Sequence, residues 1–213
     1  MIDYGKVYTQ IDGFLQTREG LANPKNKHDY NLFLRQLTGI MCGVAHENNL
    51  STDSVLEFMR AVEDHEIVDI NTEGKLCAVT DLIDCDIVAH PLYYLTEYIL
   101  MYYKPGNVQV GPGELFFCFY DRGSVFGIDN SAGYDIITDG VATEFKKLGS
   151  NFTTPELFDK YAASEDVDRL MVIKPVSSAA KPSLRSQYAC IPTNRWREAF
   201  THTGKNGTLK LVV

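Results

Sequence analysis

The chain has 213 residues, 45% hydrophobic and 23% charged, which is typical of a folded globular protein and excludes a mainly disordered or fibrous one. The N-terminus does not read as a secretory signal, and the apolar stretch 92–103 is shorter than the roughly 20 residues of a membrane span. The net charge of -8 argues against a basic surface overall, so we expect a soluble intracellular protein with, at most, a local basic region.

The sequence pattern of the first hundred residues predicts mainly helical structure. Helices are expected at 4–15 and 30–45, separated by a polar break at 23–27. Ser54 with Glu57 three residues later is a capping-box pattern that predicts the start of a third helix, ending near His65. Its expected buried face consists of residues at helical spacing: Val55, Phe58, Met59 and Val62.

The region that follows is less regular. Residues 76–79 are expected to form a strand. Pro91 predicts the start of an aromatic-rich helix that Pro105-Gly106 would end. The pattern then changes to short β-like segments, so we place a domain boundary near residue 106, between a mainly helical domain of unknown role (1–106) and a second domain (107–213).

The second domain is expected to alternate helices with short strands. In chain order we predict a helix at 114–120, strands at 124–128, 134–137 and 141–147, a helix at 154–163 and a strand at 170–173. Asp139-Gly140 between the second and third strands is a strong hairpin signal. The fold class is therefore α+β.

The expected hairpin gathers charged residues suited to phosphodiester hydrolysis. A tight turn would bring Asp135 beside Glu144, and the two-residue period of a strand puts Glu144 and Lys146 on one face. Converging carboxylates hold magnesium, and a nearby lysine positions a nucleophile or stabilises developing charge. The same alternation is also typical of a half-exposed strand.

Three short motifs give this region a family likeness. Gly111-Pro112-Gly113-Glu114, Gly133-Tyr134-Asp135 and Glu144-Phe145-Lys146 resemble the helix start and two strands of phage-type members of the PD-(D/E)xK nuclease superfamily. The resemblance covers residues 111–175 and implies a restriction-endonuclease-like core of order αβββαβ, carrying a basic C-terminal extension. One departure is Tyr134, which stands where the motif has proline.

The resemblance implies specific roles for these residues. Asp135, Glu144 and Lys146 would be the catalytic residues of a metal-dependent DNA endonuclease, with Lys146 assisting the attacking water. Asp135, Glu144 and Glu114 would bind Mg²⁺, or Mn²⁺ in its place. Lys147 would lie next to the phosphate path. The protein would be phage-encoded and act in the host cytoplasm.

Other readings of the acidic residues stay open. Glu114 is also the kind of acid that a helix start favours. Asp121 and Asp129 are rival carboxylates, whereas Asp139 is explained by the turn. Paired carboxylates serve glycoside cleavage as well, although the adjacent lysine fits phosphate better.

The last part of the chain is basic. Residues 170–213 contain seven basic residues and a single acid, Glu198. Arg185, Arg195 and Arg197, the last two flanking Trp196, are therefore candidates for DNA contact. Alternatively, this stretch pairs with the acidic first half, and Trp196 anchors a core.

Other function classes find less support. The five cysteines show no paired zinc-type spacing and are expected to be reduced thiols. No nucleophile elbow or Walker-type loop is present, which leaves esterase and nucleotide triphosphatase without a motif. The alternative function is a non-catalytic virion structural or accessory protein that keeps a nuclease-like core. In either case the N-terminal half would mediate oligomerisation or bind a protein partner, and no membrane is involved.

Overall fold

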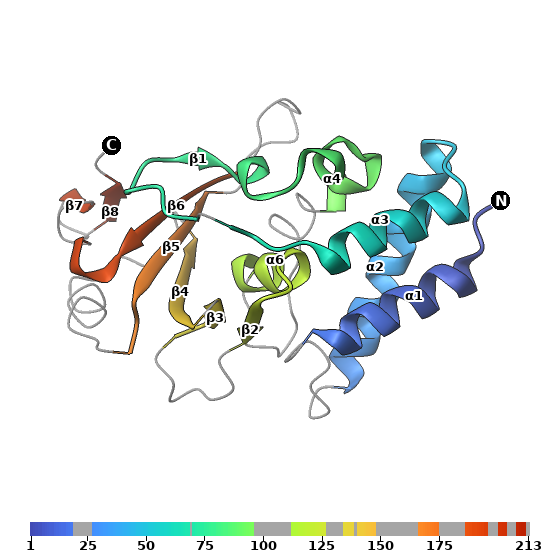
Figure 1. Ribbon diagram of the computed structural model, residues 1–213, viewed down its shortest axis with the longest axis horizontal. Helices are drawn as coiled ribbons and strands as arrows, with labels where there is room; N and C mark the ends of the chain where they lie inside the picture. Colours follow the sequence, from blue (N-terminus) through green and yellow to red (C-terminus); the bar gives the residue numbers. More distant parts are fainter. Residues whose placement is uncertain are drawn as a thin grey trace. The chain divides into compact units, whose positions relative to one another are not determined.

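The computed structural model describes the chain in segments, which form two compact units (Figure 1). The described residues are 1–18, 27–68, 70–95, 112–126, 134–138, 140–147, 166–174, 186–195, 200–203 and 208–211. The first unit comprises residues 1–67 and 83–125, and the second comprises 68–82 and 126–213. The boundary that we predicted near residue 106 lies outside the described residues, and the units divide the chain at other positions.

The first unit is helical. Its elements are α1 (Tyr4–Thr17), α2 (Lys27–Glu47), α3 (Thr52–Asp64), α4 (Cys85–Ala89), the 3-10 helix η3 (Pro91–Tyr93) and α6 (Pro112–Tyr120). Helix α1 packs against both α2 and α3. The predicted helices 4–15, 30–45 and 114–120 are confirmed, and Pro91 begins a 3-10 helix.

Helix α3 shows how local sequence fixes an element and where our reading was wrong by one turn. The N-cap is Ser51, whose side chain accepts a hydrogen bond from Ser54 N–H (3.1 Å), so Ser54 lies inside the first turn. The four predicted apolar positions are all buried, and His65 is the C-cap. Ser51 and Ser54 both have a hydroxyl that could cap the helix. The N-cap is Ser51 because its backbone is still extended, as an N-cap requires.

Helix α6 is apolar on every side. All its residues from Leu115 to Tyr120 are buried, which is the pattern of a core helix. The ring of Phe119 meets that of Phe14 of α1 edge to face, with centroids 5.1 Å apart. This helix is therefore part of the core of the first unit.

The second unit contains a mixed sheet. Its strands are β1 (Cys77–Ala78), β3 (Ile136–Thr138), β4 (Val141–Lys147), β5 (Arg169–Lys174) and β6 (Gln187–Pro192), and with β2 (Ser124–Phe126) the order is β1-β6-β5-β4-β3-β2. Strands β4 and β5 are parallel, and the pairs β3–β4, β5–β6 and β1–β6 are antiparallel. The 3-10 helices η2 (Val79–Leu82) and η4 (Thr193–Arg195) follow β1 and β6, and β7 (Phe200–Thr203) pairs with β8 (Thr208–Leu211) in a separate sheet. The protein is thus α+β.

Two features of this sheet differ from the predicted organisation. Strand β6, from the stretch that we expected to be an extension, lies between β1 and β5 inside the sheet. Strand β1, which we placed in the N-terminal domain, pairs with β6. The predicted helix 154–163 lies outside the described residues. The predicted strand 141–147 is confirmed with the same bounds, and those at 76–79, 134–137 and 170–173 are present with shifted ends. The strand predicted at 124–128 is confirmed over 124–126, and residues 127–128 lie outside the described residues.

Candidate functional site

The β3–β4 hairpin is the scaffold of the candidate site. Its two strands pair with Ile136 opposite Thr143 and Thr138 opposite Val141. Gly140 in the connection has φ +77°, a conformation that glycine adopts without strain and other residues rarely do. The Asp-Gly signal in the sequence therefore predicted this turn for the correct physical reason.

Asp135 stands directly before β3 and is bound to β4 by two hydrogen bonds. Its N–H donates to the carbonyl of Thr143 (3.0 Å), and its Oδ2 accepts from Phe145 N–H (2.7 Å). Phe145 follows Glu144 in β4, so the Asp135 carboxylate lies against the backbone of the strand that carries Glu144. The structure thus brings together these two predicted residues.

Glu144 is a buried carboxylate in the middle of the sheet, with only 5% of its surface exposed. Its partner position on the parallel strand β5 is Leu170, which is fully buried. Lys146 and Lys147 follow on β4, opposite Val172 and Ile173. Burying a carboxylate costs free energy unless polar or cationic groups surround it, so the burial of Glu144 calls for a structural or functional explanation.

Glu114 belongs to the first unit, in the first turn of α6, where it is half-buried. An acid there is favoured by the partial positive charge of the helix N-terminus, which agrees with the structural explanation of this residue. Asp135 and Glu144 belong to the second unit.

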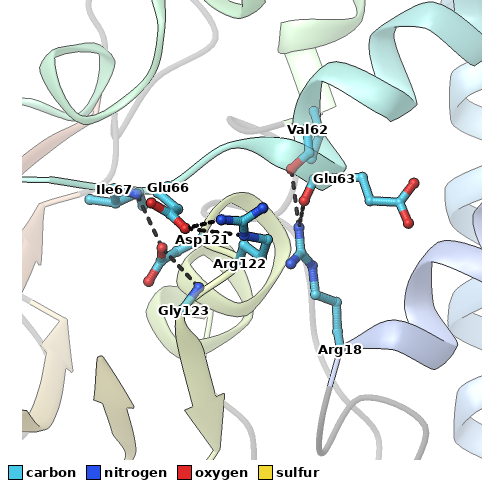
Figure 2. Close-up of polar contacts among 8 residues, drawn as sticks. All are labelled: Arg18, Val62, Glu63, Glu66, Ile67, Asp121, Arg122 and Gly123. Atoms are coloured by element: carbon cyan, nitrogen blue, oxygen red, sulfur yellow. Dashed lines mark hydrogen bonds and ion pairs between the residues drawn. The ribbon is translucent and has the colours of Figure 1, made fainter. Parts of the chain in front are cut away.

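Asp121, a rival carboxylate in the sequence, has a structural role in the first unit (Figure 2). It is 1% exposed, and its Oδ1 accepts from Ile67 N–H (3.1 Å) and Gly123 N–H (3.3 Å). Its Oδ2 accepts from the Ser124 hydroxyl. Asp121 therefore ties the chain after α3 to the turn after α6. Asp129 and Asp139 lie outside the described residues.

Further contacts reinforce this connection. The Arg122 side chain donates to Glu66, and Arg122 N–H donates to the His65 carbonyl (2.9 Å). Buried Arg18 donates from Nη2 to the carbonyls of Val62 (3.1 Å) and Glu63 (3.0 Å) at the end of α3 (Figure 2). Burial lowers the pKa of Arg18, while the charge of Asp121 acts in the opposite direction.

His65 contributes through its ring. Its Nδ1 lies 2.7 Å from the Tyr120 carbonyl, and its Nε2 lies 3.1 Å from the backbone nitrogen of Asp84. A carbonyl only accepts and an N–H only donates, so these partners assign the neutral ring with the proton on Nδ1. The ring is thus committed to joining α3, α4 and α6.

The predicted DNA-contact arginines are only partly described. Arg195 is exposed in η4, directly after β6, a place compatible with a surface contact. Arg185 and Arg197, with Trp196, lie outside the described residues.

The sequence reading missed Asp168 and Arg169 at the start of β5. Asp168 Oδ2 accepts from Ala142 N–H (2.8 Å), and Asp168 N–H donates to the Ala142 carbonyl (3.0 Å). Arg169 Nε donates to the Thr143 hydroxyl (2.7 Å). These contacts fix β5 against the start of β4. An Asp-Arg pair directly before an apolar strand was the only local signal.

The cysteines are free thiols in this structure. Cys118 and Cys190 are buried, and burial raises the pKa of Cys118 well above its ordinary value and that of Cys190 to about 11. Within the described segments, no three His, Cys, Asp or Glu side chains gather in a way that would hold a metal ion.

Comparison with protein-family models, with curated proteins and with solved structures found no match for this chain. None of the helices in the described part of the chain is both long and apolar enough to cross a membrane.

Proposed function

We propose that the protein is a metal-dependent DNA endonuclease of the PD-(D/E)xK type. The observation that carries the proposal is the hydrogen bond from Phe145 N–H to the Asp135 carboxylate (2.7 Å), which holds one acid against the strand of the other. Glu144 is next to Phe145 on that strand, and Lys146 follows two positions after Glu144. This is the set of groups that the three sequence motifs imply.

The order of elements gives independent support. Helix α6 is followed by β2, β3, β4 and β5, and β4 is parallel to β5. A parallel pair needs a crossover of about a dozen residues or more, usually helical, and residues 148–168 are long enough to provide it. This order is compatible with the restriction-endonuclease-like αβββαβ core that the resemblance implies.

The donor set fits a hard divalent cation. Magnesium prefers carboxylate oxygens and retains several waters, so Asp135 and Glu144 would hold Mg²⁺ or Mn²⁺. When bound, the ion supplies an activated water and neutralises charge on the phosphate. The hydrogen bond from Phe145 N–H orients the Asp135 carboxylate. Lys146 would stabilise the developing negative charge near the attacking water.

The DNA backbone would be bound by basic residues outside this centre. Lys147 follows Lys146 on β4, and Arg195 is exposed after β6. Arg185 and Arg197 would complete the contact. The cellular setting proposed is the host cytoplasm, for a phage-encoded enzyme.

A second candidate is a non-catalytic virion structural or accessory protein with the same core. The observation that favours it is that the Asp135 carboxylate satisfies a β4 backbone N–H, a structural task that needs no metal. In that case Glu144 is held by its surroundings in the sheet, and no turnover is expected.

The endonuclease and the structural protein can be told apart by substitutions that remove the charge of Asp135 or Glu144 but keep the shape of the side chain. Asp135→Asn keeps an oxygen that accepts the Phe145 N–H, and Glu144→Gln keeps the volume of the side chain. Asp168→Asn is the matched control, because Asp168 also accepts a β4 N–H (Ala142, 2.8 Å) but belongs to none of the motifs.

The assay is conversion of supercoiled plasmid to nicked and linear forms in Mg²⁺, Mn²⁺ or chelator. We expect metal-dependent cleavage that falls at least ~100-fold in Asp135→Asn and Glu144→Gln but stays at the wild-type level in Asp168→Asn. Undiminished cleavage in both active-centre variants, with melting temperatures unchanged, would falsify the endonuclease assignment. No cleavage by folded wild-type protein on duplex, branched or single-stranded DNA favours the structural role.

A further inference from the structure

The registers of β4, β5 and β6 assign their residues to two faces. Glu144 pairs with Leu170, which pairs with Ile191, and one step along the same face Lys146 pairs with Val172, which pairs with Ala189. At the next step Lys174 of β5 pairs with Gln187 of β6. Because side chains alternate along a strand, all these positions belong to one face.

This face is divided between apolar and polar positions. Its central residues are fully or almost fully buried: Leu170, Val172, Ala189 and Ile191. The polar positions form a diagonal that crosses three neighbouring strands. We call this diagonal the polar row; it consists of Glu144, Lys146, Lys174 and Gln187.

Ideal strand spacing gives the size of the row. Lys146 and Lys174 stand on adjacent strands and are two residues apart in register, so about 8 Å separates their Cα atoms. Lys174 and Gln187 are directly opposite, at about 5 Å. Two cationic positions and an amide therefore follow the buried carboxylate within a span that one phosphodiester segment would cover.

The opposite face shows that this gathering is not a general property of β5 and β6. That face carries Lys147 of β4 next to Ile173, which pairs with Tyr188, and one step before them Met171 opposite Cys190. These four residues of β5 and β6 are buried. Among the described pairs of β5 and β6, the pair in which both residues are polar, Lys174 with Gln187, thus lies on the face of Glu144. Charged groups next to a buried apolar surface are costly unless a partner of opposite charge or water meets them.

We propose that Lys174 and Gln187 extend the active centre across β5 and β6 and bind the phosphate backbone of the substrate. The proposal rests on the endonuclease function and adds two residues that no sequence motif singled out. The substrate class is a polyanionic phosphodiester chain, contacted by a lysine as a point charge and by an amide that donates a hydrogen bond. Glu144 and Lys146 would act at the scissile phosphate, and the rest of the row would hold a neighbouring one.

The test separates binding from cleavage. Fluorescence anisotropy with a labelled DNA duplex in chelator measures affinity over a range of salt concentrations for wild type, Lys174→Gln, Lys174→Arg and Gln187→Ala. Lys75→Gln is the matched control, since Lys75 is an exposed lysine in the same unit and lies outside the row.

A lysine that contacts one phosphate contributes about 0.9 to the slope of log affinity against log salt, which is about eightfold in affinity between 1 M and 0.1 M salt. We expect Lys174→Gln to lose this increment, Lys174→Arg to retain it, and Lys75→Gln to match wild type. Gln187→Ala should weaken binding without changing the slope, because the amide carries no charge.

Outcomes for the row and for the nuclease are distinguishable. An unchanged salt slope in Lys174→Gln, or an equal loss in Lys75→Gln, overturns the row, whatever the cleavage assay shows. Absence of DNA binding by wild type overturns it too. A smaller salt slope in Lys174→Gln, with the slope of Lys75→Gln unchanged, supports the row. If metal-dependent cleavage is absent in that case, the endonuclease function fails and the phosphate contact stands.

Discussion

Replacement of Asp121 tests whether this acid is structural. In Asp121→Ala, the buried Ile67 N–H loses its acceptor, and so do Gly123 N–H and the Ser124 hydroxyl. One buried unsatisfied donor costs about 1–3 kcal/mol, and the two less critical bonds add about 1 kcal/mol together, so we expect a loss of about 3 kcal/mol of unfolding free energy. Asp121→Asn keeps one oxygen acceptor and should cost only about 1 kcal/mol.

The assay combines urea unfolding with amide hydrogen exchange. Unfolding gives the free-energy loss, and exchange at the Ile67 amide reports the local bond, which should lose protection in Asp121→Ala. Exposed Asp64 supplies the control, since Asp64→Ala should change stability by less than about 0.5 kcal/mol. The reasoning is refuted if Asp121→Ala stays within about 1 kcal/mol of wild type, or if the alanine and asparagine variants are equally destabilised.

Three further predictions follow from local physical chemistry. Burial lowers the pKa of His90 in the folded protein, and the charge of Glu57 acts against this shift. The contribution of neutral His90 to stability is therefore complete above the unfolded pKa near 6.5 and is lost as the pH falls through the lower folded pKa. Between pH 7.5 and pH 5 the unfolding free energy should drop more in wild type than in His90→Gln, and equal drops would contradict this. Gly140→Val should lower stability by about 1–2 kcal/mol because of the positive φ, as measured by urea unfolding, and a neutral effect would mean that the turn adopts another conformation. The raised pKa of buried Cys190 should make it react with a thiol reagent at pH 8 far more slowly than exposed Cys85, as peptide mapping of the early label would show; early labelling of Cys190 would contradict its burial.

Local sequence predicted most of the individual elements. The spacing of Val7, Ile11, Phe14 and Leu15 gives α1 a single buried face, and the Asp139-Gly140 pair gives the β3–β4 turn. The same hairpin brings Asp135 to β4, as expected from the turn. These features depend on residues within about ten positions of one another, where periodicity and turn chemistry act directly.

Other features had no local signal. Asp121 is an acid near a turn, as Asp135 is, and only the fold gives it the N–H of Ile67, from a distant part of the chain, as partner. The carboxylate of Asp168 was equally undistinguished in sequence, although it binds the start of β4. A carboxylate's role depends on which donors surround it, and those donors come from distant parts of the chain.

The sequence by itself determined that the chain is α+β, where most helices and strands lie, and that Asp135, Glu144 and Lys146 share one hairpin. Tertiary structure alone decided that Cys77 pairs with Tyr188, that β6 lies inside the sheet rather than in an appended tail, and that residues 68–82 join the second unit. The physical reason is the range of the interactions: a helix or tight turn is stabilised by neighbours in sequence, whereas strand pairing across a hundred residues depends on the burial of the whole sheet.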